Sequence, residues 1–199
     1  MAELTVAIGG FGAIGAKVAR ALDDGISDLR LVAISARDHA GARSRMDGMR
    51  SPPPVVELQK LAALADVVVE CAPAAVFSEV AEAAIARGCI FIPSSIGALL
   101  DHWHLIEAAS QSGARIIAPT GALLGLDAVR AAAEGTIHRV SMITRKPPAG
   151  LAGSPHLQQN KISIEGLTEA VRVFKGSAQE GIKGFPANVN VAVAVHDDV

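Results

Sequence analysis

The first 22 residues place a glycine-rich turn between an apolar run and a helical segment. Residues 4–8 form a short apolar run typical of a buried strand, and residues 10–15 read GFGAIG. Residues 13–22 show the spacing of a helix with one apolar face. That face is expected to carry Ile14, Val18 and Leu22. A strand, a glycine turn and a helix in this order predict the first unit of a parallel sheet covered by helices.

The three glycines of this turn each suit one part of a dinucleotide-binding site. Gly10 permits the tight turn, Gly12 lets the backbone approach a pyrophosphate, and Gly15 lets the helix pack closely on the strand. The helix N-terminus at Ala13 and Ile14 offers unpaired N–H groups and a partial positive charge to phosphates. The alternative is a turn that is glycine-rich only for packing. We expect the turn to bind NAD or NADP.

The end of the second apolar run bears on which nucleotide binds. NAD-selective sites carry Asp or Glu about 20 residues beyond the glycine motif, and this chain has Ser35 there, followed by Ala36, Arg37 and Asp38. A small hydroxyl residue followed by Arg37 accommodates the 2′-phosphate of NADP. Two alternatives stay open: Asp38 holds a ribose hydroxyl if the strand ends later, or Arg37 is a solvated loop charge. We expect NADP to bind at least as tightly as NAD.

Apolar strand-like runs and helical segments alternate from residue 4 to about residue 118. The expected strands are residues 4–8, 29–35, 65–71, 89–93 and 114–118, with a short one at 55–58, and the expected helices are residues 13–22, 76–87 and 100–112. The polar stretch 43–50 and the prolines at 52–54 indicate a surface loop. This alternation predicts an α/β fold, a Rossmann-type doubly wound parallel sheet, in a domain of residues 1–119.

The pattern changes after residue 119. Residues 136–146 alternate between apolar and polar side chains, and they predict a strand, as do residues 169–174. Residues 123–134 and 177–183 predict helices, and 189–195 form an apolar run. Strands of this kind are typical of a more antiparallel sheet. We therefore expect a second, smaller and incomplete α+β domain at residues 120–199.

Composition argues against several classes of partner. Half of the residues are hydrophobic, 3% are aromatic and the formal net charge is -2, which suits a packed globular protein and disfavours nucleic-acid binding. No apolar run approaches the roughly 20 residues of a membrane span, and no secretory signal pattern is seen, so we expect a cytoplasmic protein. Cys71 and Cys89 are expected to be reduced core thiols, and no Cys or His spacing predicts a metal site.

A series of motifs along the chain resembles the L-aspartate dehydrogenase family. Besides the glycine turn, the motifs are ECA at 70–72, SSIGAL at 94–99, TGALLGLD at 120–127, TRKPP at 144–148, FKGSA at 174–178 and FPANVNVA at 185–192. The resemblance implies NAD(P)-dependent oxidation of L-aspartate to iminoaspartate, which hydrolyses to oxaloacetate or feeds NAD biosynthesis. It also implies a homodimer. The alternatives are a catalytically impaired NAD(P)-binding protein derived from this family, or a related dehydrogenase with another substrate.

The resemblance also suggests which residues contact the cofactor. It places Ala122 and Asn188 against the cofactor. It places Cys71, Ala72 and the loop from Ser95 to Gly97 along the nicotinamide side. Small or hydroxylated residues at strand ends suit a ligand there on physical grounds as well, because ligands bind beyond the carboxyl ends of parallel strands. Asn188 is alternatively a helix N-cap.

An amino-dicarboxylate substrate requires fixed cations and a base. Arg145 and Lys146, followed by two prolines, are candidates for a carboxylate clamp, and a solvated basic pair is the alternative. The base that keeps the amine neutral is usually histidine. The resemblance places that histidine downstream of residues 188–192, beyond Val199, so the catalytic residue stays unassigned. His196 is a poor substitute at a chain terminus, and His156 is the other histidine considered.

Overall fold

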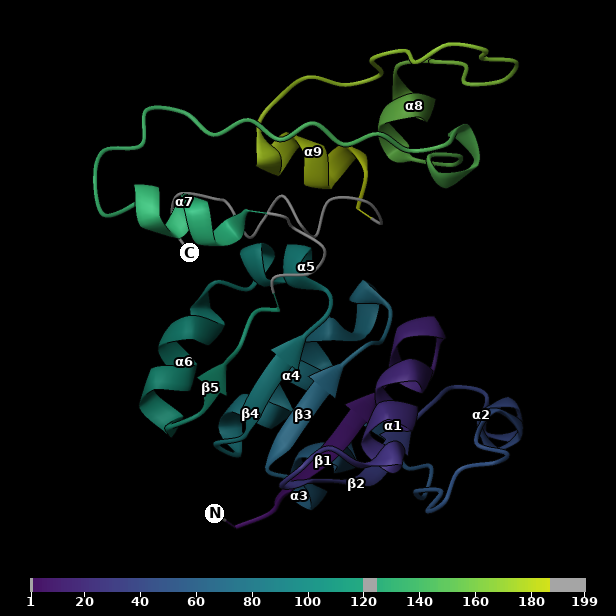
Figure 1. Cartoon of the computed structure of the whole chain (residues 1–199), viewed down its shortest axis with the longest axis vertical. Helices are drawn as coiled ribbons and strands as arrows, with labels where there is room; N and C mark the ends of the chain where they lie inside the picture. The colour runs from purple at the N-terminus through teal and green to yellow at the C-terminus, as the bar shows by residue number, and fades with distance from the viewer. Residues whose placement is uncertain (1, 120–124, 187–199) are drawn as a thin grey trace. The chain divides into compact units, whose positions relative to one another are not determined.

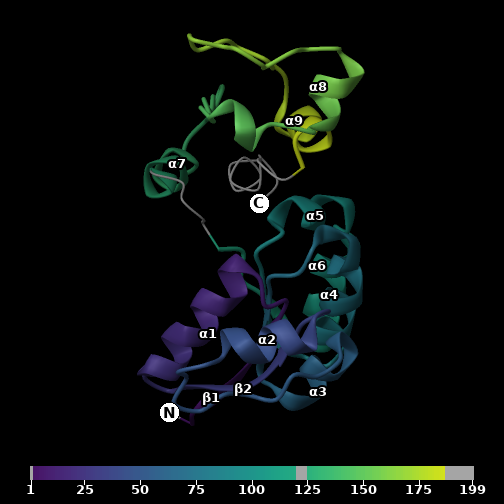
Figure 2. The same cartoon turned by 90° about the vertical axis from the view of Figure 1, so that its right-hand side faces the viewer.

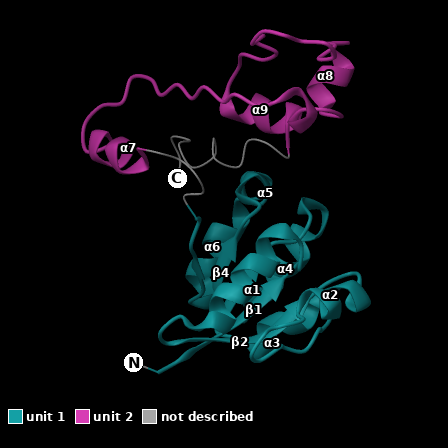
Figure 3. Cartoon of the chain, turned by 45° about the vertical axis from the view of Figure 1, so that its right-hand side comes forward, with its two compact units in different colours: residues 1–119 teal, residues 120–199 magenta. Residues whose placement is uncertain are grey.

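The computed structural model describes residues 2–119 and 125–186, which belong to two compact units (Figure 3). Unit 1 is Met1–Pro119 and unit 2 is Thr120–Val199. No helix within the described ranges is both long enough and apolar enough to cross a membrane.

Unit 1 is built on a five-stranded parallel sheet in the order β2-β1-β3-β4-β5 (Figure 1). The strands are β1 (Leu4–Gly9), β2 (Leu29–Ser35), β3 (Val67–Glu70), β4 (Ile90–Pro93) and β5 (Arg115–Ile116). The chain runs from β1 to β2 on one side, then returns to β3 on the other side of β1. This order is that of a doubly wound sheet, so the predicted Rossmann-type α/β fold is confirmed.

Helices cover both faces of this sheet (Figure 2). One face carries α1 (Ala13–Gly25) and α2 (His39–Arg45), and the other carries α3 (Leu61–Leu64), α4 (Phe77–Ala86) and α6 (His104–Ser112). Single 3₁₀ turns, η1 (Leu58–Lys60) and η2 (Ala74–Val76), precede α3 and α4, and α5 (Ile96–Asp101) follows β4.

Two separate hydrophobic cores follow from the alternation of side chains along the strands. Ala7, Val68 and Phe91 pack with α4 and α6, while Val6, Ile8 and Val67 pack with α1. The first core includes a fully buried Phe77, whose ring lies edge-on to Phe91 at 5.9 Å between centroids. Each large apolar side chain buried in this way contributes about 1.5–3 kcal/mol. The cores hold the sheet between its helices and leave the strand ends open for other contacts.

Helix α1 packs through a different face from the one predicted. Its buried residues are Gly15, Ala19 and Leu22, whereas Ile14 is 58% exposed. A Cβ on Gly15 would overlap the carbonyl oxygen of Gly10. The helix approaches the turn so closely that only small residues fit on the packed side of its first turns, and Ile14 is left outside.

Three further details of unit 1 differ from expectation. Residues 55–58 form no strand, only an isolated bridge between Val55 and Ile34, because the prolines before them have no N–H to extend a ladder and the 3₁₀ turn η1 begins at Leu58. Helix α2, which starts at an Asp38 cap, extends through Arg45 into the polar stretch 43–50 that is expected to belong to a loop. The single helix expected at 100–112 is divided into α5 and α6, with a break at His102 and Trp103.

In the described residues of unit 2, 125–186, the regular elements are short helices and the chain between them is irregular. The unit contains α7 (Leu126–Ala132), η3 (Pro148–Gly150), α8 (Pro155–Gln159) and α9 (Ala178–Gly184), so helices are formed inside the first expected segment and over most of the second. A capping box of Ser177 and Glu180 starts α9. The strands expected at 136–146 and 169–174 are not formed. A strand needs a neighbour for its ladder hydrogen bonds, and side-chain alternation alone does not provide one.

Candidate functional site

The carboxyl ends of four strands form one row at an edge of unit 1. Backbone hydrogen bonds join neighbouring ends: Gly10 N to Ser35 O at 2.9 Å, Cys71 N to Gly9 O at 2.7 Å, and Ser94 N to Glu70 O at 2.8 Å. The row includes the point between β1 and β3 where the winding reverses, the usual ligand position in such sheets. The predicted residues Gly10, Ser35, Cys71 and Ala72 therefore lie together, with Ser95 next along the row.

The glycine turn has the steric properties of a phosphate cradle. Gly10 has φ +99°, and a Cβ there would overlap the carbonyl oxygen of Cys71. Gly15 tolerates no Cβ either, because of the Gly10 carbonyl. Gly12 differs, since a Cβ on it would meet nothing within 4 Å. The backbone is thus locked at two glycines and open at the third, which fits the close approach of a pyrophosphate.

The N-terminus of α1 adds hydrogen-bond donors to this cradle. Gly12 is the N-cap, so no side chain satisfies the first N–H groups of the helix from that position. Ala13 and Ile14 are exposed, and the first turn holds no acidic residue. Unpaired N–H groups and the positive end of the helix dipole favour an anion here. These features fit the diphosphate of NAD(P).

The residues at the end of β2 bear on whether the site prefers NAD or NADP. The strand ends at Ser35, and the Asp38 carboxylate accepts a hydrogen bond from Gly41 N at 2.9 Å, which caps α2. The later strand end that would give Asp38 a ribose role is not observed. Ser35 is only 4% exposed, whereas Arg37 is exposed. Of the two predicted residues, Arg37 is the one accessible to a phosphate.

Glu70, at the end of β3, is a site residue that the sequence alone does not predict; in the sequence it is only part of the ECA motif at 70–72. It is fully buried, and its carboxylate accepts hydrogen bonds from Ala72 N, Ser95 N and Ser95 Oγ at 2.9, 3.0 and 3.1 Å. Burial raises the pKa of this carboxyl, against the opposing effect of these hydrogen bonds. The sequence feature that points to Glu70 is an acidic residue at the end of an otherwise apolar strand, Val67–Glu70.

The neighbouring Cys71 thiol contacts Ser94 Oγ at 3.4 Å. Burial raises the pKa of Cys71, and the charge of Glu70 raises it further. A thiol in this environment stays neutral near pH 7, because low thiol pKa values require nearby positive charge. Cys71 therefore offers the site a small, weakly polar side chain rather than a nucleophile.

Ser95 and Gly97 belong to the start of a helix. Ser95 is the N-cap of α5, and Gly97 is buried within α5. The loop expected from Ser95 to Gly97 is therefore shorter than predicted, and it ends at the half-buried Ser95. Ala122, Asn188 and His196 lie outside the described residues.

The predicted carboxylate clamp lies in unit 2. Arg145 and Lys146 are exposed, in an irregular segment directly before η3, and not at the end of a strand. Among the described residues neither side chain forms an ion pair or a hydrogen bond. Their charges are free to bind an anion.

His156 packs against aromatic side chains of unit 2. Its ring lies 5.2 Å from that of Phe174 and 5.3 Å from that of Phe185, centroid to centroid. The residue is part of α8. These contacts indicate a structural role for His156.

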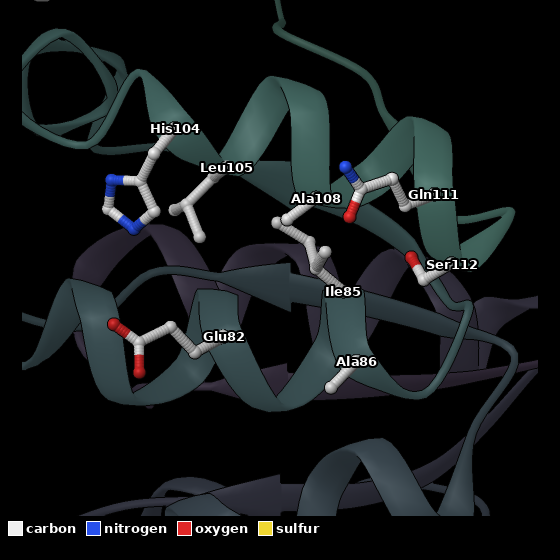
Figure 4. A pocket seen from close by; sticks show the side chains of 8 residues that line it. All are labelled: Glu82, Ile85, Ala86, His104, Leu105, Ala108, Gln111 and Ser112. Carbon is white, nitrogen blue, oxygen red and sulfur yellow. The ribbon is translucent and has the colours of Figure 1, made fainter.

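Two surface hollows are lined by residues other than the predicted site residues. A groove of about 510 Å³ runs between α4 and α6, with Glu82 and Ile85 on one side and Leu105 and Gln111 on the other (Figure 4). A hollow of about 750 Å³ in unit 2 is lined by residues between Pro148 and Leu167. The α4–α6 groove lies within the helical layer, so the strand ends remain the candidate site.

Comparisons with known proteins match both parts of the chain. Residues 10–119 match the family "Homoserine dehydrogenase, NAD binding domain", and residues 127–196 match "Aspartate dehydrogenase, C-terminal". The L-aspartate dehydrogenase of Bradyrhizobium diazoefficiens is 50% identical over 97% of this chain and 69% of its own length. L-aspartate dehydrogenase 3 of Bordetella bronchiseptica is 46% identical, over 97% and 71%. The aspartate dehydrogenase structure from Thermotoga maritima shares the fold, with a TM-score of 0.65 at 23% identity over 96% of this chain and 72% of that one.

Proposed function

This chain belongs to the L-aspartate dehydrogenase family, and on that premise we propose that it oxidises L-aspartate to iminoaspartate with NAD or NADP. Iminoaspartate then hydrolyses to oxaloacetate and ammonia. The observation that carries the proposal is the cradle at the strand ends, where Gly10 and Gly15 are sterically required and Gly12 is open. The coarser conclusion, an NAD(P)-dependent oxidoreductase, follows from the family itself.

The residues of the row would hold the two halves of the cofactor. The diphosphate would lie over Gly12 and accept hydrogen bonds from the N–H groups of Ala13 and Ile14. The nicotinamide would lie near Ala72 and Ser95, where small residues leave room for a ring. When bound, the ring supplies the acceptor for the hydride that leaves the amine-bearing carbon.

Substrate recognition is assigned to unit 2 in this proposal. Arg145 and Lys146 would bind the carboxylates of aspartate through charge-assisted hydrogen bonds. Their exposure and free charges support that role. A homodimer is part of the same proposal, and sedimentation equilibrium would measure it directly.

The activity test compares turnover with cofactor binding. Reduction of NAD and NADP is followed at mildly alkaline pH with L-aspartate, and with D-aspartate, L-glutamate and L-malate as comparisons. We expect turnover with L-aspartate alone. Tight binding of NADH or NADPH without turnover would instead support a catalytically impaired cofactor-binding protein. Turnover with L-malate would point to a different dehydrogenase reaction.

Arg37 provides a test of nucleotide preference. We expect Arg37→Ala to weaken NADPH binding about tenfold and to leave NADH binding unchanged, because only NADPH carries the 2′-phosphate that the Arg37 guanidinium is proposed to bind. The exposed Arg43→Ala on α2 is the matched control. Dissociation constants come from nicotinamide fluorescence titrations. A large preference of the unmodified chain for NADH would contradict the role given to Arg37.

A further inference from the structure

Glu70 links two loops that are far apart in sequence and that the pairing of β3 with β4 brings together. Its Oε1 accepts from Ala72 N, two residues ahead, and from Ser95 Oγ, 25 residues ahead, while Oε2 accepts from Ser95 N. The first contact belongs to the turn after β3, and the others belong to the turn between β4 and α5. One buried carboxylate therefore ties together the two strand ends proposed to receive the nicotinamide.

We propose that Glu70 is a positioning residue that fixes Ala72 and Ser95 in the geometry required to bind the nicotinamide half of NAD(P). It acts through these two neighbours and does not itself touch the cofactor. The inference rests on the cofactor placement given under the proposed function, and it does not depend on the identity of the substrate.

An ionised carboxylate suits this position better than an amide does. Three donors point at the two oxygens of Glu70, and two of them are backbone N–H groups that cannot turn away. A glutamine has one acceptor oxygen and one NH₂ group. In either orientation its NH₂ would face a backbone N–H, so one of the two main-chain hydrogen bonds, from Ala72 N or from Ser95 N, would be lost. Loss of a buried charge-assisted hydrogen bond is costly because the donor stays unsatisfied.

Protonation would disturb the same arrangement. A neutral carboxyl keeps only one oxygen without a hydrogen and loses the charge that strengthens these hydrogen bonds, so the ionised form holds the two loops more tightly than the neutral form does. Because burial raises the pKa of Glu70, this change occurs at a higher pH than in an exposed glutamate. Cofactor binding is then expected to weaken as the pH falls through that pKa. The titratable group that faces Glu70 is the Cys71 thiol, which stays neutral over this range.

The test measures whether cofactor binding and ionisation of Glu70 are linked. Amide proton shifts of Ala72 and Ser95 report the pKa of Glu70 in the full chain, with and without saturating NADH. If the ionised form binds about tenfold more tightly, the pKa falls by about one unit on binding. The phosphates of NADH acting as charges alone would raise it, so the sign separates the two explanations. An unchanged or raised pKa would overturn the proposal.

A variant gives the second measurement. Glu70→Gln is expected to weaken NADH binding about tenfold and to abolish its dependence on pH in this range. Glu82→Gln on the exposed surface of α4 makes the same chemical change outside the site and should alter neither. Unaltered NADH binding in a folded Glu70→Gln chain would also overturn the proposal. If that variant does not fold, the pKa measurement on the unmodified chain still tests the proposal. Neither measurement uses aspartate turnover. A chain that binds NADH without oxidising aspartate would therefore contradict the proposed function and leave the proposal for Glu70 intact.

Discussion

Replacing Gly15 by alanine is expected to lower the free energy of unfolding by about 3 kcal/mol, whereas the same replacement at Gly12 costs less than about 1 kcal/mol. Alanine is favoured over glycine inside a helix by about 1 kcal/mol, so propensity alone predicts the opposite sign at Gly15. The steric term dominates there, because the added methyl overlaps the backbone carbonyl of Gly10, and backbone cannot rotate away. At Gly12 the methyl meets no atom within 4 Å.

Gly12→Ala, the variant with the smaller effect on stability, is expected to have a direct effect on cofactor binding. Gly12→Ala keeps the fold but places a methyl where the pyrophosphate approaches, so NADH binding is expected to weaken at least about tenfold. Urea denaturation gives the stabilities, and fluorescence titration gives the dissociation constants. If Gly12→Ala binds NADH as well as the unmodified chain does, the cofactor does not lie over this turn.

Replacing Lys146 by alanine is expected to raise the Michaelis constant for L-aspartate by about 10- to 100-fold and to leave NAD(P) affinity intact. The estimate follows from the loss of one charge-assisted hydrogen bond to a carboxylate, about 1.5–3 kcal/mol. Lys146 is exposed and unpaired among the described residues, so its removal costs little stability. Steady-state kinetics with varied aspartate measure the effect.

Lys183→Ala on α9 is the matched control for Lys146, since it removes the same charge from an exposed position in the same unit. It should leave the Michaelis constant within about twofold of the original, because a distant exposed charge is screened by water and salt. A Lys146→Ala chain with an unchanged Michaelis constant would mean that this lysine is a solvated surface charge.

The parallel sheet could be predicted because its signals are local. Short apolar runs such as Leu29–Ser35 (β2) predict strands by themselves, and glycines at helix ends mark where a helix stops before the next strand. The tight turn expected at Gly10 and the close packing expected at Gly15 agree with the positive φ of Gly10 and with the contact of Gly15 to the Gly10 carbonyl. The packed face of α1 was missed at Ile14, where the close approach of backbone outweighed hydrophobicity.

Features that depend on distant partners could not be predicted in this way. Residues 136–146 alternate like a strand, yet alternation says nothing of a neighbouring strand to pair with. The Glu70 network depends on Ser95, 25 residues away, and on the register that brings β3 beside β4. Asp38 shows the same limit at short range, since the sequence suggests a ribose contact for it and the structure makes it the N-cap of α2.

The row at the strand ends is joined mainly through main-chain atoms, from Ser35 across Gly10 and Cys71 to Ser94. Main-chain groups are the same in every residue type, so side chains around the row are free to change while the cradle keeps its shape. A lineage can therefore acquire a new substrate by altering a few side chains, without having to rebuild its nucleotide site. The exceptions are positions such as Gly10 and Glu70, where geometry or charge admits a single residue type, and drift should be slowest there.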